Sequence, residues 1–323
     1  MKLPKVLIRV LARFYLGNPY MGDWITERYS TLKTYVKLIF NQLLYVFRSD
    51  LTPFLLSINI DPINRCNLKC KSCRGYFTFP PTDDGMSLDF FKQIISEIPH
   101  SVENVNLSMY SEPLLHPHIF EMIHITARAG FRPTIFTNGT LITESVAERL
   151  LKAPLDSINL SMEVDEQNSL EWRGISQKKS EEILALLLRT KKKLHSPVKI
   201  KISLVAHASN SSQLKAFIQK MKYQVDGIKV SPMIIRKKGE KKKACSELWR
   251  GNLTIFSNGD CIPCCGDFSR ELNLGSLKSG TIMQIWKGTS MRKLRTLHRV
   301  RKFPPVCANC SIDKSVGLNR FKN

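Results

Sequence analysis

Cys66-Asn-Leu-Lys-Cys70-Lys-Ser-Cys73 is the stretch that decides how this chain is interpreted. It places three cysteines at the spacing C-x-x-x-C-x-x-C, directly after the apolar run from Leu55 to Ile63. Thiolates prefer soft metals and iron–sulfur clusters. No fourth cysteine lies close behind them, so a four-iron cluster held by this triad would keep one iron free for a small molecule. The spacing therefore favours a catalytic site over a purely structural one.

Length, cysteine content and charge narrow the classes of protein to which this chain can belong. The 323 residues suffice for a full core and a smaller second unit. The nine cysteines are odd in number and clustered, and residues 1–17 lack the features of a secretory signal. We therefore expect metal binding in the cytoplasm rather than a disulfide framework. The formal charge of +22 attracts anions such as phosphorylated metabolites, nucleic acid or acidic membranes, without choosing among them.

Residues 1–50 are expected to be helical. Apolar residues recur at helical spacing over 3–15 and again over 36–47, with basic residues interleaved. Neither run is long enough and free enough of charge to span a bilayer. We favour helices that pack on the following domain, because most amphipathic helices face a core. The alternative is a basic segment that lies on the inner membrane surface.

From residue 55 to about 231 the pattern alternates between strand and helix. The expected strands are 55–60, 104–109, 133–137, 157–162, 198–205 and 227–230, and the expected helices are 87–98, 118–129, 143–151, 178–194 and 211–221. Six strands joined by five helices imply right-handed crossovers and a parallel sheet. Such a sheet closes or half closes into a barrel, with its chemistry at the carboxyl ends of the strands. The cysteine triad comes directly after the first of these ends.

The predicted fold class is therefore α/β. It comprises a partial (β/α)6 parallel barrel, a small C-terminal cysteine-rich α+β domain and an N-terminal helical extension. The predicted boundaries are 1–50 for the extension, 51–235 for the barrel, 236–244 for a basic linker and 245–323 for the C-terminal domain. Six of the eight residues from Arg236 to Lys243 are basic, which favours a solvated hinge over a phosphate-binding patch.

The triad resembles the signature of the radical S-adenosylmethionine (radical SAM) superfamily, in which this loop comes after the first barrel strand. Later segments agree with the resemblance. Tyr110-Ser-Glu-Pro113 is similar to the family's Gly-Glu-Pro segment, with serine in place of glycine. Thr137-Asn-Gly139 matches another recurring segment, and Ser161-Met-Glu163 resembles the one that contacts ribose. Arg173-Gly174 also recurs in the family.

The resemblance implies a site and a chemistry. Cys66, Cys70 and Cys73 would hold a [4Fe–4S] cluster whose free iron chelates S-adenosylmethionine (SAM). One electron would then break the sulfonium bond, giving methionine and a 5′-deoxyadenosyl radical that abstracts hydrogen from carbon. The implied SAM contacts are Glu112, Pro113, Thr137, Asn138, Ser161, Glu163 and Arg173. Zinc at the triad is disfavoured because its spacing is unusual for zinc knuckles.

The sequence allows two roles for the aromatic residues that follow the triad. Tyr76 and Phe77 could shield the cluster, or they could belong to ordinary core packing.

The C-terminal cysteines resemble those of SPASM or twitch domains. Gly259-Asp-Cys-Ile-Pro-Cys264 fits the family's turn, and a hairpin is expected at Asn258-Gly259. The resemblance implies one auxiliary [4Fe–4S] cluster, with the ligands Cys245, Cys264, Cys307 and Cys310. Cys261 and Cys265 would then be extra, although Cys265 could replace Cys264. Structural zinc on the same thiolates is the alternative.

The favoured function is an oxidoreductase that dehydrogenates a small polar or sugar-like metabolite, because an auxiliary cluster can accept the electron left on a substrate radical. The implied partners are a small-molecule or peptide substrate, with the charge suiting an anionic one, and an electron donor such as flavodoxin or ferredoxin. Maturation of a ribosomal peptide is the first alternative. A non-catalytic, zinc-stabilised protein that binds nucleic acid is the second, and no stacking or helix-turn-helix motif supports it.

No general base is singled out among the barrel histidines. Glu163 and Asp165, near a predicted strand end, are better candidates for contact with ribose or substrate. The histidines weighed are His116, His118, His124 and His207.

Overall fold

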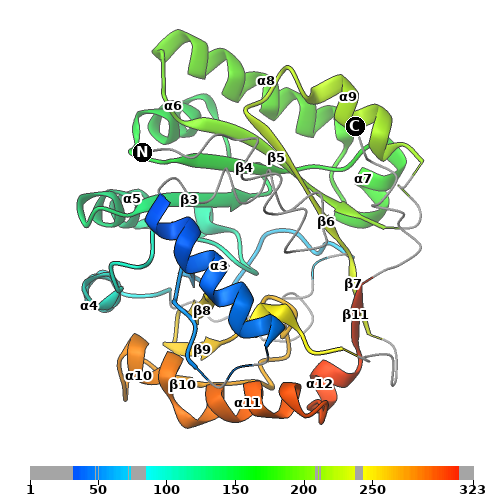
Figure 1. The fold of residues 1–323 in the computed structure, drawn as a ribbon. Helices are drawn as coiled ribbons and strands as arrows, with labels where there is room; N and C mark the ends of the chain where they lie inside the picture. Colours follow the sequence, from blue (N-terminus) through cyan, green and yellow to red (C-terminus); the bar gives the residue numbers. More distant parts are fainter. Residues whose placement is uncertain are drawn as a thin grey trace.

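A computed structural model of the chain describes residues 32–47, 49, 51–71, 73, 85–207, 210, 212–236 and 243–312 (Figure 1). The helix predicted over 3–15, the aromatics Tyr76 and Phe77, and most of the basic linker lie outside the described residues.

One nine-stranded sheet forms the centre of the molecule, with the order β10-β9-β8-β1-β2-β3-β4-β5-β6. From β1 to β6 every neighbouring pair is parallel and keeps the chain order. These strands are β1 (Ser57–Asp61), β2 (Asn104–Asn106), β3 (Arg132–Thr137), β4 (Ser157–Ser161), β5 (Lys199–Ala206) and β6 (Gly227–Pro232). The predicted six parallel strands of a partial barrel are confirmed, and β2 is shorter than expected.

The helices between these strands cover the outer face of the sheet, as in Figure 1. Serine or threonine caps three of them, because a hydroxyl oxygen can accept from a free amide of the first turn. Ser87 accepts from Phe90 N in this way at the start of α4. The five predicted helices are α4 (Leu88–Glu97), α5 (Ile119–Arg128), α6 (Glu144–Lys152), α8 (Gln177–Leu194) and α9 (Leu214–Met221).

A further helix, α7 (Glu166–Arg173), was not expected from the sequence. Its residues are mostly polar and show no apolar period, so the usual signal for a helix is missing. Asp165 caps its start by accepting from Asn168 N, and Gly174 ends it with a φ of 70°. Local capping therefore defines this helix better than hydrophobic periodicity does.

Residues alternate between the two faces of the sheet, because successive side chains of a strand point in opposite directions. Ile58, Ile60, Ile158 and Ile200 are fully buried in one core with the helices. The residues between them point to the inner face of the partial barrel and are largely polar: Asn59, Asn106, Thr134, Asn159, Lys201 and Lys229. The sequence thus builds an apolar exterior under the helices and a polar interior.

The C-terminal region extends the same sheet. β8 (Asn252–Phe256) pairs in parallel with β1, and β9 (Asp260–Ile262) returns antiparallel through the predicted turn at Asn258-Gly259. β10 (Gly275–Ser276) lies at the edge. The sequence predicted a small domain beside the barrel, whereas the structure joins the hairpin of this region directly to the first barrel strand.

Short helices and a second small sheet complete this region (Figure 1). They are η3 (Ser246–Trp249), α10 (Ile282–Lys287), α11 (Thr289–Arg299) and α12 (Pro305–Ala308). β11 (Cys310–Ile312) pairs antiparallel with β7 (Ile234–Arg236), so Cys310 lies opposite Arg236. The last cysteine is therefore tied to the point where the chain leaves the barrel.

Helix α3 (Leu32–Val46) confirms the second helical run of the N-terminal region. The side-chain amide of Asn41 donates to the Phe54 carbonyl oxygen and accepts from the Phe54 backbone N–H, at 2.7 Å each. Tyr45 packs on Trp249 with ring centroids 5.7 Å apart. Several of its apolar residues are exposed, among them Val36 and Phe40. Among the described helices, none has the length and apolar character needed to cross a membrane.

Substitution of Gly251 tests how much the close packing of backbone where β1 and β8 pair contributes to stability. Its φ is +80°, and a Cβ there would lie 2.2 Å from the Phe54 carbonyl oxygen. Its own carbonyl accepts from Leu56 N and Ser57 N. We expect Gly251→Ala to lower the free energy of unfolding by about 2–4 kcal/mol, from the positive φ and the clash together. Denaturant unfolding followed by circular dichroism measures this.

Gly130→Ala is the matched control. Gly130 has a φ of +85°, but no atom lies within 4 Å of the added Cβ. Only the cost of the backbone conformation remains, about 1 kcal/mol. Equal losses in the two variants would show that the close approach at Gly251 has no energetic weight.

Candidate active site

The cysteine triad lies where the sequence predicted, in the loop after the carboxyl end of β1. All three cysteines are half-buried. Two backbone bonds fix the described part of the loop: Cys73 N donates to Cys70 O at 3.0 Å, and Lys71 N donates to Trp172 O at 2.7 Å. The second bond ties the triad to the C-terminal end of α7, so the unpredicted helix is part of the site.

The three thiols lie close enough to influence one another. Desolvation by burial raises the pKa of Cys66 to about 11, and negative charge on Cys70 and Cys73 contributes to this rise. Burial also raises the pKa of Cys70, whereas the cation of Arg173 lowers it. Thiols are deprotonated when they bind a metal, which offsets such penalties. Three grouped thiols beside a cation are a donor set that fits an iron–sulfur cluster.

Within the described part of the chain, no three His, Cys, Asp or Glu side chains converge closely enough to hold a single metal ion. A four-iron cluster has a different geometry, because each thiolate binds its own iron atom and the sulfurs stand further apart.

Glu112 connects two of the predicted segments. The residue is buried, and its carboxylate accepts from Thr137 Oγ1 at 2.7 Å, from Asn138 N at 2.8 Å and from Leu114 N at 3.2 Å. Desolvation raises the pKa of Glu112, and these hydrogen bonds act in the opposite direction. The carboxylate is therefore held in place at the carboxyl edge of β2 and β3, with Pro113 starting the short helix η1 (Pro113–Leu115) behind it.

Asn138 connects the same network to the triad. Its Nδ2 atom lies 3.7 Å from Cys66 Sγ and donates to Asn67 Oδ1 at 2.9 Å. Asn67 in turn donates to Thr140 Oγ1 at 2.7 Å. The loops after β1 and β3 thus contact each other directly, through residues that lie 73 positions apart in the chain.

Asp61 was missed by the sequence analysis. It ends β1, is 1 % exposed, and accepts from the backbone amides of Met109, Tyr110 and Ser111 at 3.2–3.4 Å. The Ser111 hydroxyl also donates to it. Burial raises the pKa of Asp61, and these bonds lower it. Asp61 therefore positions the segment that carries Glu112, and serine in place of the family's glycine adds one bond to it.

Ser161, Glu163 and Arg173 come together at the end of β4. The Arg173 guanidinium donates to the Ser161 carbonyl oxygen, and its charge favours the ionised forms of Cys70, Glu112 and Glu163. Arg173 is thus the cation shared by the triad and by both predicted carboxylates.

Glu163 has partners that the sequence did not single out. Its Oε2 atom accepts from Asn210 Nδ2 at 3.3 Å and lies 3.6 Å from His207 Nε2. The His207 ring packs on Trp172 with centroids 4.2 Å apart. Desolvation raises the pKa of Glu163 to about 7, although Arg173 opposes this.

The other candidate side chains take structural positions. His116 Nε2 lies 3.1 Å from Met86 O, and its Nδ1 accepts from His118 N. Asp165 caps α7. His118 and His124 lie on or beside α5, where His118 is 4.0 Å from Glu121. Only His207, among the four barrel histidines, is therefore placed beside a predicted SAM contact.

The C-terminal cysteines form a second group. Cys245 precedes η3. Burial raises the pKa values of Cys264 and Cys265, and the charge of Cys245 adds to both rises, so these three lie near one another. Cys265 is exposed, yet desolvation by the atoms packed around its thiol raises its pKa to about 11, and the cation of Lys229 lowers it. Cys261 is buried on β9.

The other two predicted ligands come from the end of the described chain. Cys307 lies in α12, and Cys310 begins β11.

One tyrosine joins the segment of Glu112 to the second cysteine group. Tyr110, beside Glu112 in the chain, donates from its hydroxyl to Cys265 O at 3.0 Å. Its ring stacks on Phe256 with centroids 5.9 Å apart, and the Arg270 guanidinium lies 3.6 Å from the same Phe256 centroid. The segment that holds Glu112 is therefore bonded to the loop that carries Cys264 and Cys265.

We expect Asp61→Ala to loosen the segment that carries Glu112. Three partly buried amides and one hydroxyl would lose their acceptor, which costs at least about 2 kcal/mol in the free energy of unfolding. Amide hydrogen exchange at Met109–Ser111 should also accelerate. Ser111→Ala, which removes the hydroxyl bond alone, should cost less than about 1.5 kcal/mol. Unchanged exchange in Asp61→Ala would refute the positioning role.

Glu163 generates a pH prediction. Its carboxyl holds a proton up to about pH 7 when folded, but only up to its usual value of 4.5 when unfolded. The folded chain therefore binds more protons between these values, and the free energy of unfolding falls as pH rises through them. Glu163→Gln should flatten this part of the pH profile. Glu171→Gln, at an exposed carboxylate, should keep the wild-type slope, measured by denaturant unfolding at pH 5–8.

Comparison with known proteins agrees with this geometry. Residues 60–212 match the model of the radical SAM superfamily, and residues 245–311 match that of the SPASM iron–sulfur cluster-binding domain. The chain is 32 % identical over 98 residues to the AdoMet-dependent heme synthase of Methanosarcina barkeri. This match covers 30 % of the present chain and 28 % of the heme synthase. The chain thus matches less than a third of that relative's length.

Solved structures share the fold over most of the chain. BtrN in complex with AdoMet and 2-DOIA has a TM-score of 0.57 at 16 % identity, covering 81 % of this chain and 94 % of BtrN. SuiB from Streptococcus suis, bound to the precursor peptide SuiA, has a TM-score of 0.59 at 14 % identity, covering 90 % of this chain and 76 % of SuiB. At these identities the likeness establishes the fold.

The two domain matches name SAM and iron–sulfur chemistry for the two regions in which the cysteine groups lie, as the sequence predicted. With its triad at the carboxyl edge of a partial barrel and its second cysteine group on an extension of the same sheet, this chain is a member of the radical SAM superfamily that carries a SPASM iron–sulfur cluster-binding domain.

Proposed function

We propose that the chain cleaves SAM reductively and uses the resulting radical to dehydrogenate a small polar or sugar-like metabolite. The observation that carries the proposal is the grouping of Cys66, Cys70 and Cys73 beside the Glu112 network and Arg173. The triad would hold a [4Fe–4S] cluster, which when reduced would supply the electron for cleavage of SAM into methionine and a 5′-deoxyadenosyl radical able to abstract hydrogen from a substrate carbon.

The residues around the triad have distinct proposed roles. Cys66, Cys70 and Cys73 hold the cluster, and the cation of Arg173 favours the thiolate form of Cys70. Glu112 accepts from the amino group of SAM, because a carboxylate oxygen with one hydrogen bond keeps a further lone pair. Thr137 and Asn138 hold that carboxylate in position through the bonds described above.

A second set of residues would orient the rest of the cofactor. Ser161 and Glu163 lie at the carboxyl end of β4, and Arg173 bonds the Ser161 carbonyl. We assign them to the ribose and its surroundings, with Pro113 fixing the turn beside Glu112. His207 and Asn210 then act as positioning residues, because they contact Glu163 directly.

Cys245, Cys264, Cys307 and Cys310 are the proposed ligands of the auxiliary cluster. Such a cluster offers a place for the electron that a substrate radical must lose to complete an oxidation. The bond from Tyr110 to the Cys265 backbone supports a short connection between the two centres. Cys265 remains the alternative ligand to Cys264, because both thiols lie near Cys245.

Maturation of a ribosomal peptide is the second candidate. The fold likeness to SuiB, solved with its precursor peptide, supports it. The described N-terminal part, helix α3, packs on η3 through Tyr45 and Trp249. A dehydrogenase and a peptide maturase differ in the size of substrate that the inner face must admit.

Two partners belong to the same proposal. A reduced flavodoxin or ferredoxin would supply the electron to the triad. The exposed apolar residues of α3 and its C-terminal end, which include Val36, Phe40 and Phe47, support peripheral contact of the N-terminal region with the inner membrane surface.

Cleavage of SAM without substrate tests the proposal. Full-length protein reconstituted anaerobically and reduced with dithionite should form 5′-deoxyadenosine from SAM, measured by liquid chromatography. Replacing Cys66, Cys70 and Cys73 together by alanine should abolish this product and remove about half of the iron. Cys261→Ala should keep both, because Cys261 is buried on β9 outside the proposed ligand set.

Two single variants identify the auxiliary ligand. Either Cys264→Ala or Cys265→Ala, but not both, should lose about half of the iron. Wild-type protein that carries its iron and forms no 5′-deoxyadenosine would contradict the proposed function.

A further inference from the structure

The thiols of the triad have different surroundings. The cation of Arg173 acts on Cys70, whose Sγ atom lies 3.8 Å from the Arg173 carbonyl oxygen. Cys66 instead faces the negative charge of Glu112 and is approached by two N–H groups. One cysteine is thus influenced by a cation, and another by hydrogen-bond donors.

Both N–H groups are directed at the sulfur atom of Cys66. The backbone N–H of Leu68 donates to it at an N···S distance of 3.5 Å, and the side-chain amide of Asn138 donates at 3.7 Å. Burial raises the pKa of Cys66, and the bond from Leu68 acts in the opposite direction. N–H donors at this sulfur therefore favour its negatively charged form.

The amide of Asn138 is held in the orientation that the bond to sulfur requires. Its Oδ1 atom accepts from the backbone N of Thr140 at 2.8 Å and from the Thr140 hydroxyl at 2.6 Å. Because the amide is planar, an oxygen fixed on one side leaves the NH2 group on the other. That group has two hydrogens, and its acceptors are Asn67 Oδ1 at 2.9 Å and the sulfur of Cys66.

Three polar side chains close into a ring around this amide. Asn138 donates to Asn67, Asn67 donates to Thr140 Oγ1 at 2.7 Å, and Thr140 donates back to Asn138. Asn138 is 8 % exposed, so water competes little for its donor. Its backbone N–H goes to Glu112 Oε2 and takes no part in the ring. The side chain of Asn138 therefore acts separately from the backbone group that holds Glu112.

Hydrogen bonds to the ligand sulfurs are one of the influences that set the reduction potential of an iron–sulfur cluster. Reduction adds one electron, which would come here from flavodoxin or ferredoxin, and no covalent bond forms or breaks. An N–H dipole directed at a ligand sulfur stabilises the added negative charge. The bond therefore favours the reduced form and raises the potential.

We propose that the side chain of Asn138 is a positioning residue that acts through Cys66: it hydrogen-bonds the sulfur and raises the potential of the cluster that the triad would hold. This inference rests on the proposed function and names a determinant of electron entry at the same site. The bonds of Asn67 and Thr140 serve to direct the Asn138 amide. The donor also offsets the negative charge of Glu112, which faces the same sulfur.

Redox titration followed by electron paramagnetic resonance tests the inference without turnover. Full-length protein that carries its clusters is reduced stepwise, as wild type and as Asn138→Leu, which keeps the approximate shape of the side chain and removes its donor. The signal that disappears when Cys66, Cys70 and Cys73 are replaced by alanine belongs to the triad. At the wild-type midpoint potential, the ratio of reduced to oxidised triad cluster should fall at least about threefold in Asn138→Leu. The midpoint of the auxiliary signal should not change.

A second variant separates the donor from its support. Thr140→Val removes the hydroxyl, but the backbone N–H at this position still holds Asn138 Oδ1. The ratio should therefore fall less than in Asn138→Leu. If Asn138→Leu loses the iron of the triad, Thr140→Val decides: a fall in the ratio supports the inference, and an unchanged ratio overturns it.

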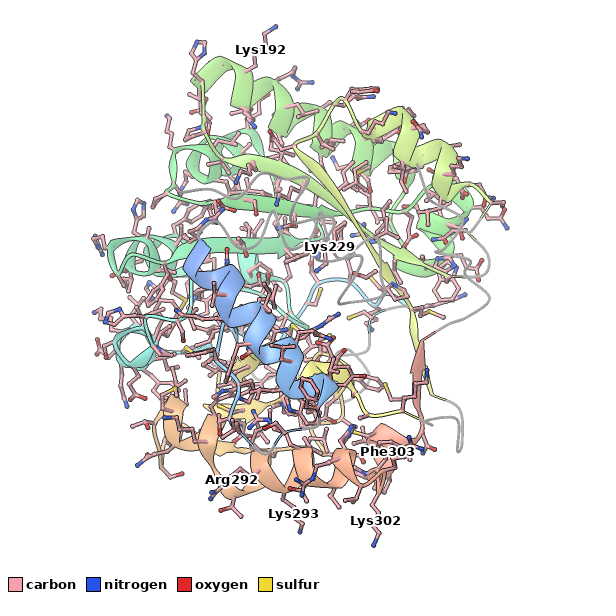
Figure 2. All side chains as sticks on the ribbon, in the orientation of Figure 1. Lys192, Lys229, Arg292, Lys293, Lys302 and Phe303 are labelled. Carbon is pink, nitrogen blue, oxygen red and sulfur yellow. The ribbon has the colours of Figure 1, made fainter. Side chains whose placement is uncertain are left out.

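Two control variants exclude general effects. Asn159→Leu removes another buried amide, whose partners are Ile135 O and Ser157 Oγ within the sheet. Lys192→Met removes a positive charge from the periphery, where Figure 2 shows Lys192 projecting from α8. Both should keep the wild-type midpoint, because exposed charges are screened by salt. The inference is overturned if either control shifts as much as Asn138→Leu, or if Asn138→Leu retains its iron and does not shift.

The two proposals can fail separately. If the wild type forms 5′-deoxyadenosine and Asn138→Leu keeps the wild-type midpoint, the inference is wrong and the proposed function stands. If the midpoint shifts in Asn138→Leu but the wild type forms no 5′-deoxyadenosine, the proposed function is wrong and the role of Asn138 stands.

Discussion

The parallel pairing of β1 on both of its edges is the constraint on which the site depends. β2 lies on one side and β8 on the other, so the first barrel strand is central in the sheet. Its apolar side chains are fully buried, which fixes its register. Asp61 at its carboxyl end and the cysteine triad just beyond are therefore placed accurately. The same pairing brings the SPASM region against the radical SAM site.

Charge is distributed unevenly around this strand end. Asp61 and Glu112 are buried carboxylates whose hydrogen bonds position the surrounding loops, and Arg173 supplies one cation to three acidic groups. Lys229 supplies a second cation nearer to Cys265. Thiolates are stabilised by positive charge nearby, and these two residues provide it from different elements, Arg173 from α7 and Lys229 from β6. Cations thus organise the site as much as the cysteines do.

Much of the fold was predictable because its signals are local. The alternation of strand and helix patterns identified the six parallel strands, and in the structure the hydroxyls of Ser87 and Thr143 cap two of the predicted helices. Helix α7 was missed because its apolar residues do not recur at helical spacing, although Asp165 caps its start and Gly174 marks its end. The triad and the Glu112, Thr137 and Asn138 segments were predicted by resemblance, and the structure brings them together.

The sequence by itself determined the chemistry: thiolates at a fixed spacing, carboxylates after strands, and an alternation that makes one face of the sheet polar. Those properties belong to single residues and short spacings. Only the tertiary structure decided which strands became neighbours, because strand order depends on packing between distant segments. It placed β8 beside β1, Ser111 on Asp61, and His207 on Glu163. Each of these contacts joins residues whose spacing in the chain carries no signal of their proximity.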